Sequence, residues 1–148
     1  MRALLGLLLA CTAAPALADE CGDLVDRVAA ETRAEVGERS ADYANFRGGA
    51  DTTLTLACGG SYASSVGAQF RGDAPPDAYY AVFGRAGHAV TGIAAAVIEE
   101  AAHRAQATAT RLRHSNIDVG KALVTCSAMA SDKGPLTLCA VIERSERS

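Results

Sequence analysis

Hydrophobic and polar positions along the chain follow two periods, and each period predicts a different kind of element. Residues 21–36 repeat apolar side chains at helical spacing, with charged side chains on the other side, which predicts a helix that stops at Gly37. Residues 38–51 are polar and contain glycine, so we expect a connecting loop. Residues 52–58 alternate with a period of two and are rich in threonine, which is typical of a half-buried strand.

A second strand is predicted over residues 62–70, after a glycine-containing turn. A three-residue loop sets Leu54 opposite Val66 and Cys58 opposite Tyr62. In this register one face of the hairpin is apolar and carries Leu54, Leu56, Cys58, Val66, Ala68 and Phe70.

The longest helical pattern covers residues 77–112. An apolar row runs from Val90 to Leu112, and Gly92 lies inside it. Because glycine weakens a helix, we expect two consecutive helices, about 77–90 and 93–112, or one helix with a kink between them.

The last predicted strands, residues 117–129 and 136–143, are joined by a tight turn with Asp132 and Lys133 at its tip. A slip of one residue from this register would mix the faces, which burial opposes. The register pairs Leu123 with Ile142, Met129 with Leu136 and Cys126 with Cys139, and it brings Thr125, Leu138 and Ala140 onto the face of Leu123.

Together the elements predict a single α+β domain over residues 19–143, followed by a charged tail over residues 144–148. Their order is α-β-β-α-α-β-β. The economical arrangement is a two-layer sandwich, in which a four-stranded antiparallel sheet carries helices on one face.

Residues 1–18 have the order of a secretory signal peptide. Arg2 is the one charge before Asp19, residues 3–14 are apolar except for Thr12, and small residues precede a cut after Ala18. The apolar stretch is too short to span roughly 30 Å of hydrocarbon. We therefore expect a periplasmic or secreted protein without a transmembrane segment.

The five cysteines divide between the leader and the mature chain. Residues 8–11 are similar to a bacterial lipobox, so a lipoprotein that begins at a lipidated Cys11 is the alternative to cleavage after Ala18. The remaining cysteines are spaced too widely for zinc-ligand pairs and predict two disulfides in an exported chain. These four are Cys21, Cys58, Cys126 and Cys139.

The predicted elements also favour one disulfide pairing. The last hairpin sets Cys126 opposite Cys139, while Cys21 lies on the apolar side of the first helix and Cys58 on the apolar face of a strand. We therefore expect Cys21–Cys58 and Cys126–Cys139. In the chain-entropy model, the Cys21–Cys58 loop contributes about 3–4 kcal/mol to stability, and the shorter loop contributes less.

Charge narrows the choice of partner. The chain has 14 basic and 17 acidic residues, so loss of Arg2 with the leader leaves a net charge of −4. An acidic domain gives no reason to expect nucleic acid or an anionic membrane surface as partner.

Metal or cofactor chemistry is not predicted. Glu99, Glu100 and His103 lie close together on the predicted helix, and Glu100 and His103 have the spacing of a carboxylate–imidazole pair in di-iron bundles. The second motif and the two further glutamates that such a site needs are absent, and Glu99 and His103 point away from the apolar row. His88 and His114 have no partner at metal-ligand spacing. We expect no histidine to be needed for function.

Four side chains are candidates for ligand or partner binding. Tyr79 and Tyr80 are adjacent on a helix, so both are not expected to face inward, and they form the best candidate aromatic contact. Arg104 and Arg111 lie seven residues apart on one side of a helix, where they could receive an anion or an acidic partner.

No catalytic motif emerges, since the glycine-rich turn after Cys58 lacks the order of a nucleophile elbow. The sequence favours a non-catalytic, disulfide-stabilised module of the bacterial cell envelope that binds a protein or a small ligand. The alternative is a small secreted hydrolase with a histidine base, which requires a histidine close to a carboxylate or a hydroxyl.

Overall fold

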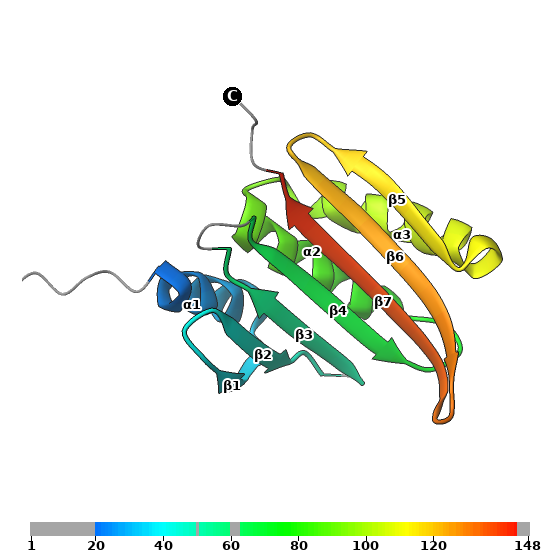
Figure 1. Ribbon diagram of the computed structural model, residues 1–148, viewed down its shortest axis with the longest axis horizontal. Helices are drawn as coiled ribbons and strands as arrows, with labels where there is room; N and C mark the ends of the chain where they lie inside the picture. Colours follow the sequence, from blue (N-terminus) through cyan, green and yellow to red (C-terminus); the bar gives the residue numbers. More distant parts are fainter. Residues whose placement is uncertain (1–19, 50, 60–62, 145–148) are drawn as a thin grey trace, which may run out of the picture.

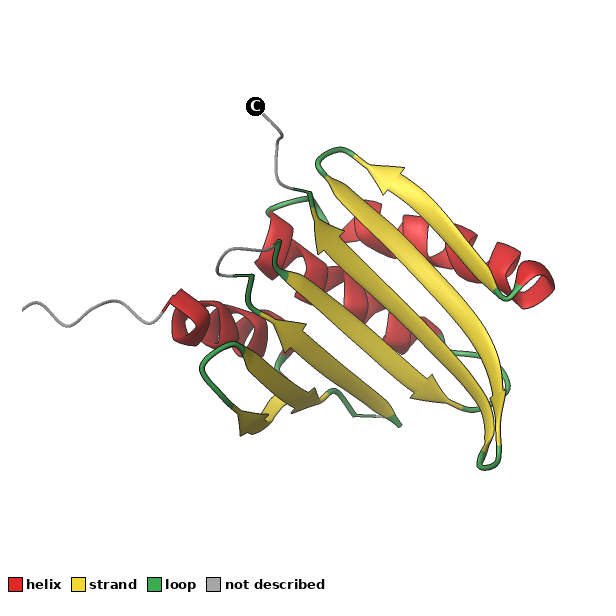
Figure 2. Ribbon diagram, viewed as in Figure 1, coloured by secondary structure: helices red, strands yellow, loops and turns green. Residues whose placement is uncertain are grey.

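Seven antiparallel strands form one sheet, and three helices cover one of its faces (Figures 1 and 2). The computed structural model describes residues 20–49, 51–59 and 63–144. The helices are α1 (Glu20–Thr32), α2 (Asp77–Thr91) and α3 (Ala95–Leu112). The strands are β1 (Glu35–Arg39), β2 (Tyr43–Arg47), β3 (Thr52–Ala57), β4 (Ser65–Arg71), β5 (His114–Val119), β6 (Ala122–Ser131) and β7 (Gly134–Glu143). Their order across the sheet is β1-β2-β3-β4-β7-β6-β5.

The predicted four-stranded sheet and the predicted order α-β-β-α-α-β-β are wrong, although the α+β class is confirmed. Residues 38–51, expected to be a loop, include all of β2 and the end of β1. The predicted strand over residues 117–129 is divided into β5 and β6 by a turn at Gly120, which has a φ of 55°. These changes add three strands to the sheet.

The first helix ends earlier than predicted. Arg33 adopts a left-handed φ of 58°, and its N–H donates to the carbonyl of Ala29 at 2.8 Å. The chain then turns into β1, where Val36 pairs with Phe46 of β2. Val36 therefore belongs to a strand, although its spacing from the preceding helix is helical.

The β3–β4 hairpin keeps its predicted faces but changes its register by two residues. Leu54 pairs with Ala68, and Leu56 pairs with Val66. Because side chains alternate with a period of two, a shift of two residues leaves the same side chains in the core. The predicted partner of Cys58, Tyr62, lies outside the described residues.

The β6–β7 hairpin has the predicted register, with Leu123 opposite Ile142 and Cys126 opposite Cys139. Its buried face is the one that carries the cysteines, since Val124, Cys126, Cys139 and Val141 are completely buried beneath the helices. The face of Leu123 points the other way. The two consecutive helices are also close to their predicted bounds, and Gly92, with a φ of 75°, ends α2.

Two disulfides connect the elements in the predicted pairs. Cys21–Cys58 joins α1 to the end of β3, and Cys126–Cys139 joins β6 to β7 in the interior of the domain. The predicted signal peptide, its cut after Ala18 and the candidate lipid site Cys11 lie outside the described residues. None of the helices that the structure describes is long and apolar enough to cross a membrane.

Candidate functional site

Tyr79 and Tyr80, the predicted aromatic contact, are both buried, with 1% and 6% of their surface exposed. The expectation that one of the two faces solvent is therefore wrong. Its physical reason is that α2 has neighbours on more than one side: it packs against α1, against α3 and against the sheet. Side chains that differ by about 100° around the helix axis can then both be buried.

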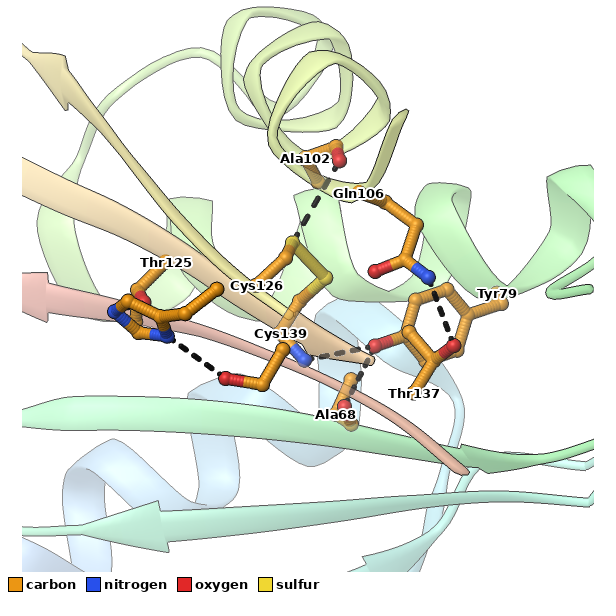
Figure 3. Close-up of a disulfide and its surroundings, with 10 residues drawn as sticks. Ala68, Tyr79, Ala102, Gln106, Thr125, Cys126, Thr137 and Cys139 are labelled. Atoms are coloured by element: carbon orange, nitrogen blue, oxygen red, sulfur yellow. Dashed lines mark hydrogen bonds between the residues drawn. A yellow bond between two sulfur atoms is a disulfide. The ribbon is translucent and has the colours of Figure 1, made fainter. Parts of the chain in front are cut away.

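The Tyr79 hydroxyl forms a bridge between α2 and the sheet. It donates to the carbonyl of Ala68 at 2.6 Å and accepts from the N–H of Cys139 at 3.0 Å (Figure 3). Burial raises the pKa of Tyr79 well above its usual range, although the Cys139 N–H acts against this rise. The phenol is therefore neutral and anchors α2 over the β4–β7 pair.

A second polar contact connects the helix layer to the sheet nearby. Gln106 of α3 donates to the hydroxyl of Thr137 on β7 at 3.0 Å, and both side chains are buried (Figure 3). The side chain of Cys126 lies 3.6 Å from the carbonyl of Ala102, also on α3. These contacts fix the helices on the sheet.

Tyr80 contacts α3 instead of the sheet. Its ring stacks on the exposed ring of His103, with centroids 3.7 Å apart and planes at 27°. Burial, and then the charge of Asp77, raise the pKa of Tyr80. The Tyr80–His103 stack gives His103 a packing role in the helix layer.

Arg104 and Arg111 are exposed on α3. Neither has an ion-pair partner in the part of the chain that the structure describes. They remain a predicted anion-binding pair, on the helix layer of the domain.

The other two histidines have hydrogen-bond or ion-pair partners that the sequence did not reveal. His88 Nδ1 lies 2.9 Å from the carbonyl of Ile93, and its Nε2 lies 3.7 Å from Glu31. His114 Nδ1 lies 2.8 Å from the hydroxyl of Ser127. The contacts with Glu31 and Ser127 join different elements, so sequence spacing could not reveal them.

The sheet face opposite the helices, which we call the outer face, is the face of Leu123 in the last hairpin. Six apolar side chains lie there in adjacent positions on β6 and β7, and we call them the apolar stripe. Met129 is 46% exposed and Leu138 is 38% exposed. The stripe consists of Leu123, Met129, Leu136, Leu138, Ala140 and Ile142.

Polar side chains without a formal negative charge flank the stripe on both sides. On one side, β4 presents Ser65 and Gln69, and β3 presents Thr53 and Thr55. On the other side, β6 and β5 present Thr125, Ser127, His114 and Asn116. These hydroxyl and amide groups can donate or accept hydrogen bonds.

Charged side chains lie towards the margins of the outer face. Arg47 of β2 pairs with Glu35 of β1, and Asp118 of β5 pairs with Arg144. A shallow hollow beside β2–β4 is lined by Arg47, Arg71 and Asp51 among others. Because Glu35 and Asp51 offset the two arginines, this hollow has no surplus of positive charge for an anion.

Gly67 lies near the centre of the outer face, opposite Ala140. A Cβ atom added there would meet the carbonyl of Cys139 at 3.6 Å and no atom closer, which is an ordinary contact. The fold therefore does not require glycine at this position. Glycine inside a strand is otherwise typical of a place where another molecule approaches the backbone closely.

No group of three or more metal-ligating side chains occurs among the described residues. The arrangement on the outer face is suited to contact with another surface, because it combines a contiguous apolar area with hydrogen-bonding groups around it. Comparison of the chain with protein-family models, with curated proteins and with solved structures finds no match.

Proposed function

We propose that this chain is a small exported, non-catalytic binding module of the bacterial cell envelope, and that it recognises a protein through the outer face of its sheet. The observation that carries the proposal is the apolar stripe on β6 and β7, on the face without helices. Contiguous exposed apolar side chains on a folded domain are typical of interaction sites.

The distribution of apolar side chains over the two faces of the β6–β7 hairpin supports this proposal. A sheet with one face in solvent usually alternates apolar side chains towards the core with polar side chains towards water. Here β7 has Cys139 and Val141 towards the core, and Leu138 and Ala140 on the outer face. Apolar side chains on both faces indicate that both faces are covered when the protein functions.

The location is supported by the order of residues 1–18 and by the two disulfides. A charged start, an apolar stretch and small residues before a cut are the parts of a secretory signal. Disulfides persist in oxidising compartments such as the periplasm. Both features agree with an exported protein.

Site-specific photo-cross-linking in the producing cells tests the recognition surface. A photoreactive residue replaces Leu138 on the outer face in one variant and Arg104 on the helix layer in a matched control. We expect a discrete protein adduct from position 138 and none from position 104, because the contact lies on the outer face.

Adducts from position 104 alone would instead favour the arginine pair Arg104 and Arg111 as the binding surface. Adducts from neither position would contradict the binding-module proposal. A third variant, Gly67→Arg with the photoreactive residue at position 138, places a long charged side chain in the centre of the face and should remove the adduct.

A small secreted hydrolase is the second candidate, and one contact favours it: the hydroxyl of Ser127 lies 2.8 Å from Nδ1 of His114. A serine hydroxyl next to a histidine base is the arrangement of an activated nucleophile. The other ring nitrogen lies 3.3 Å from the hydroxyl of Thr125, and no carboxylate among the described residues contacts the ring.

A fluorophosphonate probe distinguishes the two candidates, because it labels activated serines. We expect no label on Ser127. Labelling of Ser127 that disappears in the His114→Gln variant would establish the hydrolase in place of the binding module.

A further inference from the structure

The side chains of the outer face follow a pattern about a line that crosses the strands. The line passes through residues that face each other on neighbouring strands, namely Cys126, Cys139, Ala68, Leu54 and Phe46. All five point into the core. Their neighbours in the sequence, one on each side of the line, therefore point outward.

Near the line, two of the strands place a larger side chain on one side and a smaller one on the other. On β7, Leu138 corresponds to Ala140, and on β4, Gln69 corresponds to Gly67. Threonines correspond on β3, at positions 53 and 55. On β6 the two positions hold the hydroxyl residues Ser127 and Thr125.

This pattern is compatible with a two-fold axis along the line. Such an axis places a second outer face on the first, so that each residue faces the residue across the line in the second copy. Leu138 then meets Ala140 of the second copy, and Gln69 meets Gly67. Large side chains enter the space left by small ones, in both directions at once.

The residues at the ends of the apolar stripe and the charged residues of the outer face are also compatible with this axis. Leu123 faces Met129 of the second copy, so apolar side chains meet apolar side chains. Arg71 faces Ser65 of the second copy, which brings no like charges together. Two sheets that pack face to face lie about 10 Å apart, and their strands cross at about 30°. Residues of the two copies therefore face each other most directly near the axis.

We propose that the protein partner of the outer face is a second copy of this chain, in a two-fold dimer whose axis crosses the strands over the Cys126–Cys139 pair. The inference rests on the proposed function, since it takes the outer face as the recognition surface. Seven strands about 4.8 Å apart and about six residues long cover roughly 600 Å², which approaches the roughly 800 Å² per partner of a standard interface.

Sedimentation velocity of the oxidised mature chain tests the dimer, over about 1 to 100 µM, where interfaces of this size commonly dissociate. The informative variant is Ala140→Leu, which fills the space that Leu138 of the second copy would occupy. We expect its dimer dissociation constant to rise at least about tenfold, although the variant is more apolar, because overpacking is unfavourable.

The double variant Leu138→Ala, Ala140→Leu exchanges the large and the small side chain, and it should return the dissociation constant to within about threefold of the original. Leu112→Asp is the matched control, since Leu112 is 69% exposed on the helix layer, and its dimer should be unchanged. Because the side chains at positions 138 and 140 project from the outer face, each variant keeps its fold.

A monomer at every concentration would overturn the dimer, as would a dimer that Ala140→Leu leaves unchanged or strengthens. The proposed function fails separately. A monomer whose photoreactive position 138 forms an adduct with a different protein removes the second copy but keeps the binding module. A monomer that forms no adduct at position 138 or at position 104 removes both.

Discussion

Tyr79 illustrates, at the scale of single residues, how a polar atom is accommodated between a helix and a sheet. Its ring packs edge to face against Phe70 and Tyr80, while its hydroxyl contacts backbone groups of two strands. A buried hydroxyl without these bonds would lose the free energy of hydration. The two hydrogen bonds make this position specific for tyrosine.

Tyr79→Phe tests this role. The variant keeps the ring but leaves the carbonyl of Ala68 and the N–H of Cys139 without their bonds to the hydroxyl, so the free energy of unfolding should fall by about 1–3 kcal/mol. Urea unfolding followed by circular dichroism measures the change. Tyr43→Phe is the control, because Tyr43 is 37% exposed, and an equal loss there would contradict the assigned role.

Tyr79 should also make stability depend on alkaline pH. The tyrosine pKa is about 10 in the unfolded chain, and burial raises the pKa of Tyr79 in the folded domain. Above about pH 10 the unfolded chain loses this proton and the folded chain keeps it, so the free energy of unfolding falls by up to about 1.4 kcal/mol per pH unit.

Urea unfolding between about pH 8 and pH 11 measures that slope. In Tyr79→Phe the slope should be smaller by the contribution of this one group, while Tyr80, whose pKa burial also raises, still contributes. The same slope in both proteins would show that Tyr79 ionises freely in the folded state.

The elements differ in how clearly the sequence signals them. The β6–β7 register was predictable because Asp132 and Lys133 specify a tight turn and the cysteines face each other. In β1 the side chains are nearly all exposed, so this edge strand has no alternation of apolar and polar residues to detect. Gly120 was the available signal for the β5–β6 turn, inside an otherwise continuous strand pattern.

The outer face could not be predicted for a related reason. Leu123 and Val124 are both apolar and adjacent in β6, so the pattern does not indicate which one faces the core. Contact with α3 decides between them, and this contact joins elements that are separate in the sequence. The sites of Tyr79 and His114 likewise depend on contacts between elements.

Gly84 provides a test at the scale of elements. A Cβ atom there would lie 2.7 Å from the carbonyl of Ala95 and 3.2 Å from Cβ of Glu99, so α2 and α3 would have to separate. Although alanine has the higher helix propensity, we expect Gly84→Ala to lower the free energy of unfolding by about 1–3 kcal/mol.

Urea unfolding at low protein concentration measures the effect of Gly84→Ala. Gly67→Ala is the matched control, because its Cβ atom meets nothing closer than 3.6 Å. A gain in stability from Gly84→Ala would mean that the two helices are not in close contact at this glycine.

At the scale of the whole molecule, the two faces of the sheet differ in what covers them. The three helices cover one face of the sheet, and the apolar stripe lies on the other. Cys21–Cys58 ties α1 to the β1–β4 half, and Cys126–Cys139 ties the β6–β7 pair. Each half of the sheet thus has its own disulfide. Covalent links of this kind add stability to a small domain whose core contains few aromatic side chains.

The proposed export of the chain leads to a direct prediction. N-terminal sequencing of the secreted or periplasmic protein should begin at Asp19, because residues 16–18 have the small-residue pattern of a cleavage site. Ala18→Arg is expected to block cleavage and to leave the leader attached. A mature protein that begins at an acylated Cys11 would establish the lipoprotein instead.

Each disulfide joins two cysteines that follow one another in the order of the sequence, Cys21 with Cys58 and Cys126 with Cys139. If the chain is exported from its N-terminus as proposed, Cys21 and Cys58 leave the translocation channel before Cys126 and Cys139 emerge. An oxidase that joins each new thiol to the free thiol already outside would therefore form both native bonds directly. Oxidative folding of this domain would need a donor of disulfides but no isomerase to rearrange them.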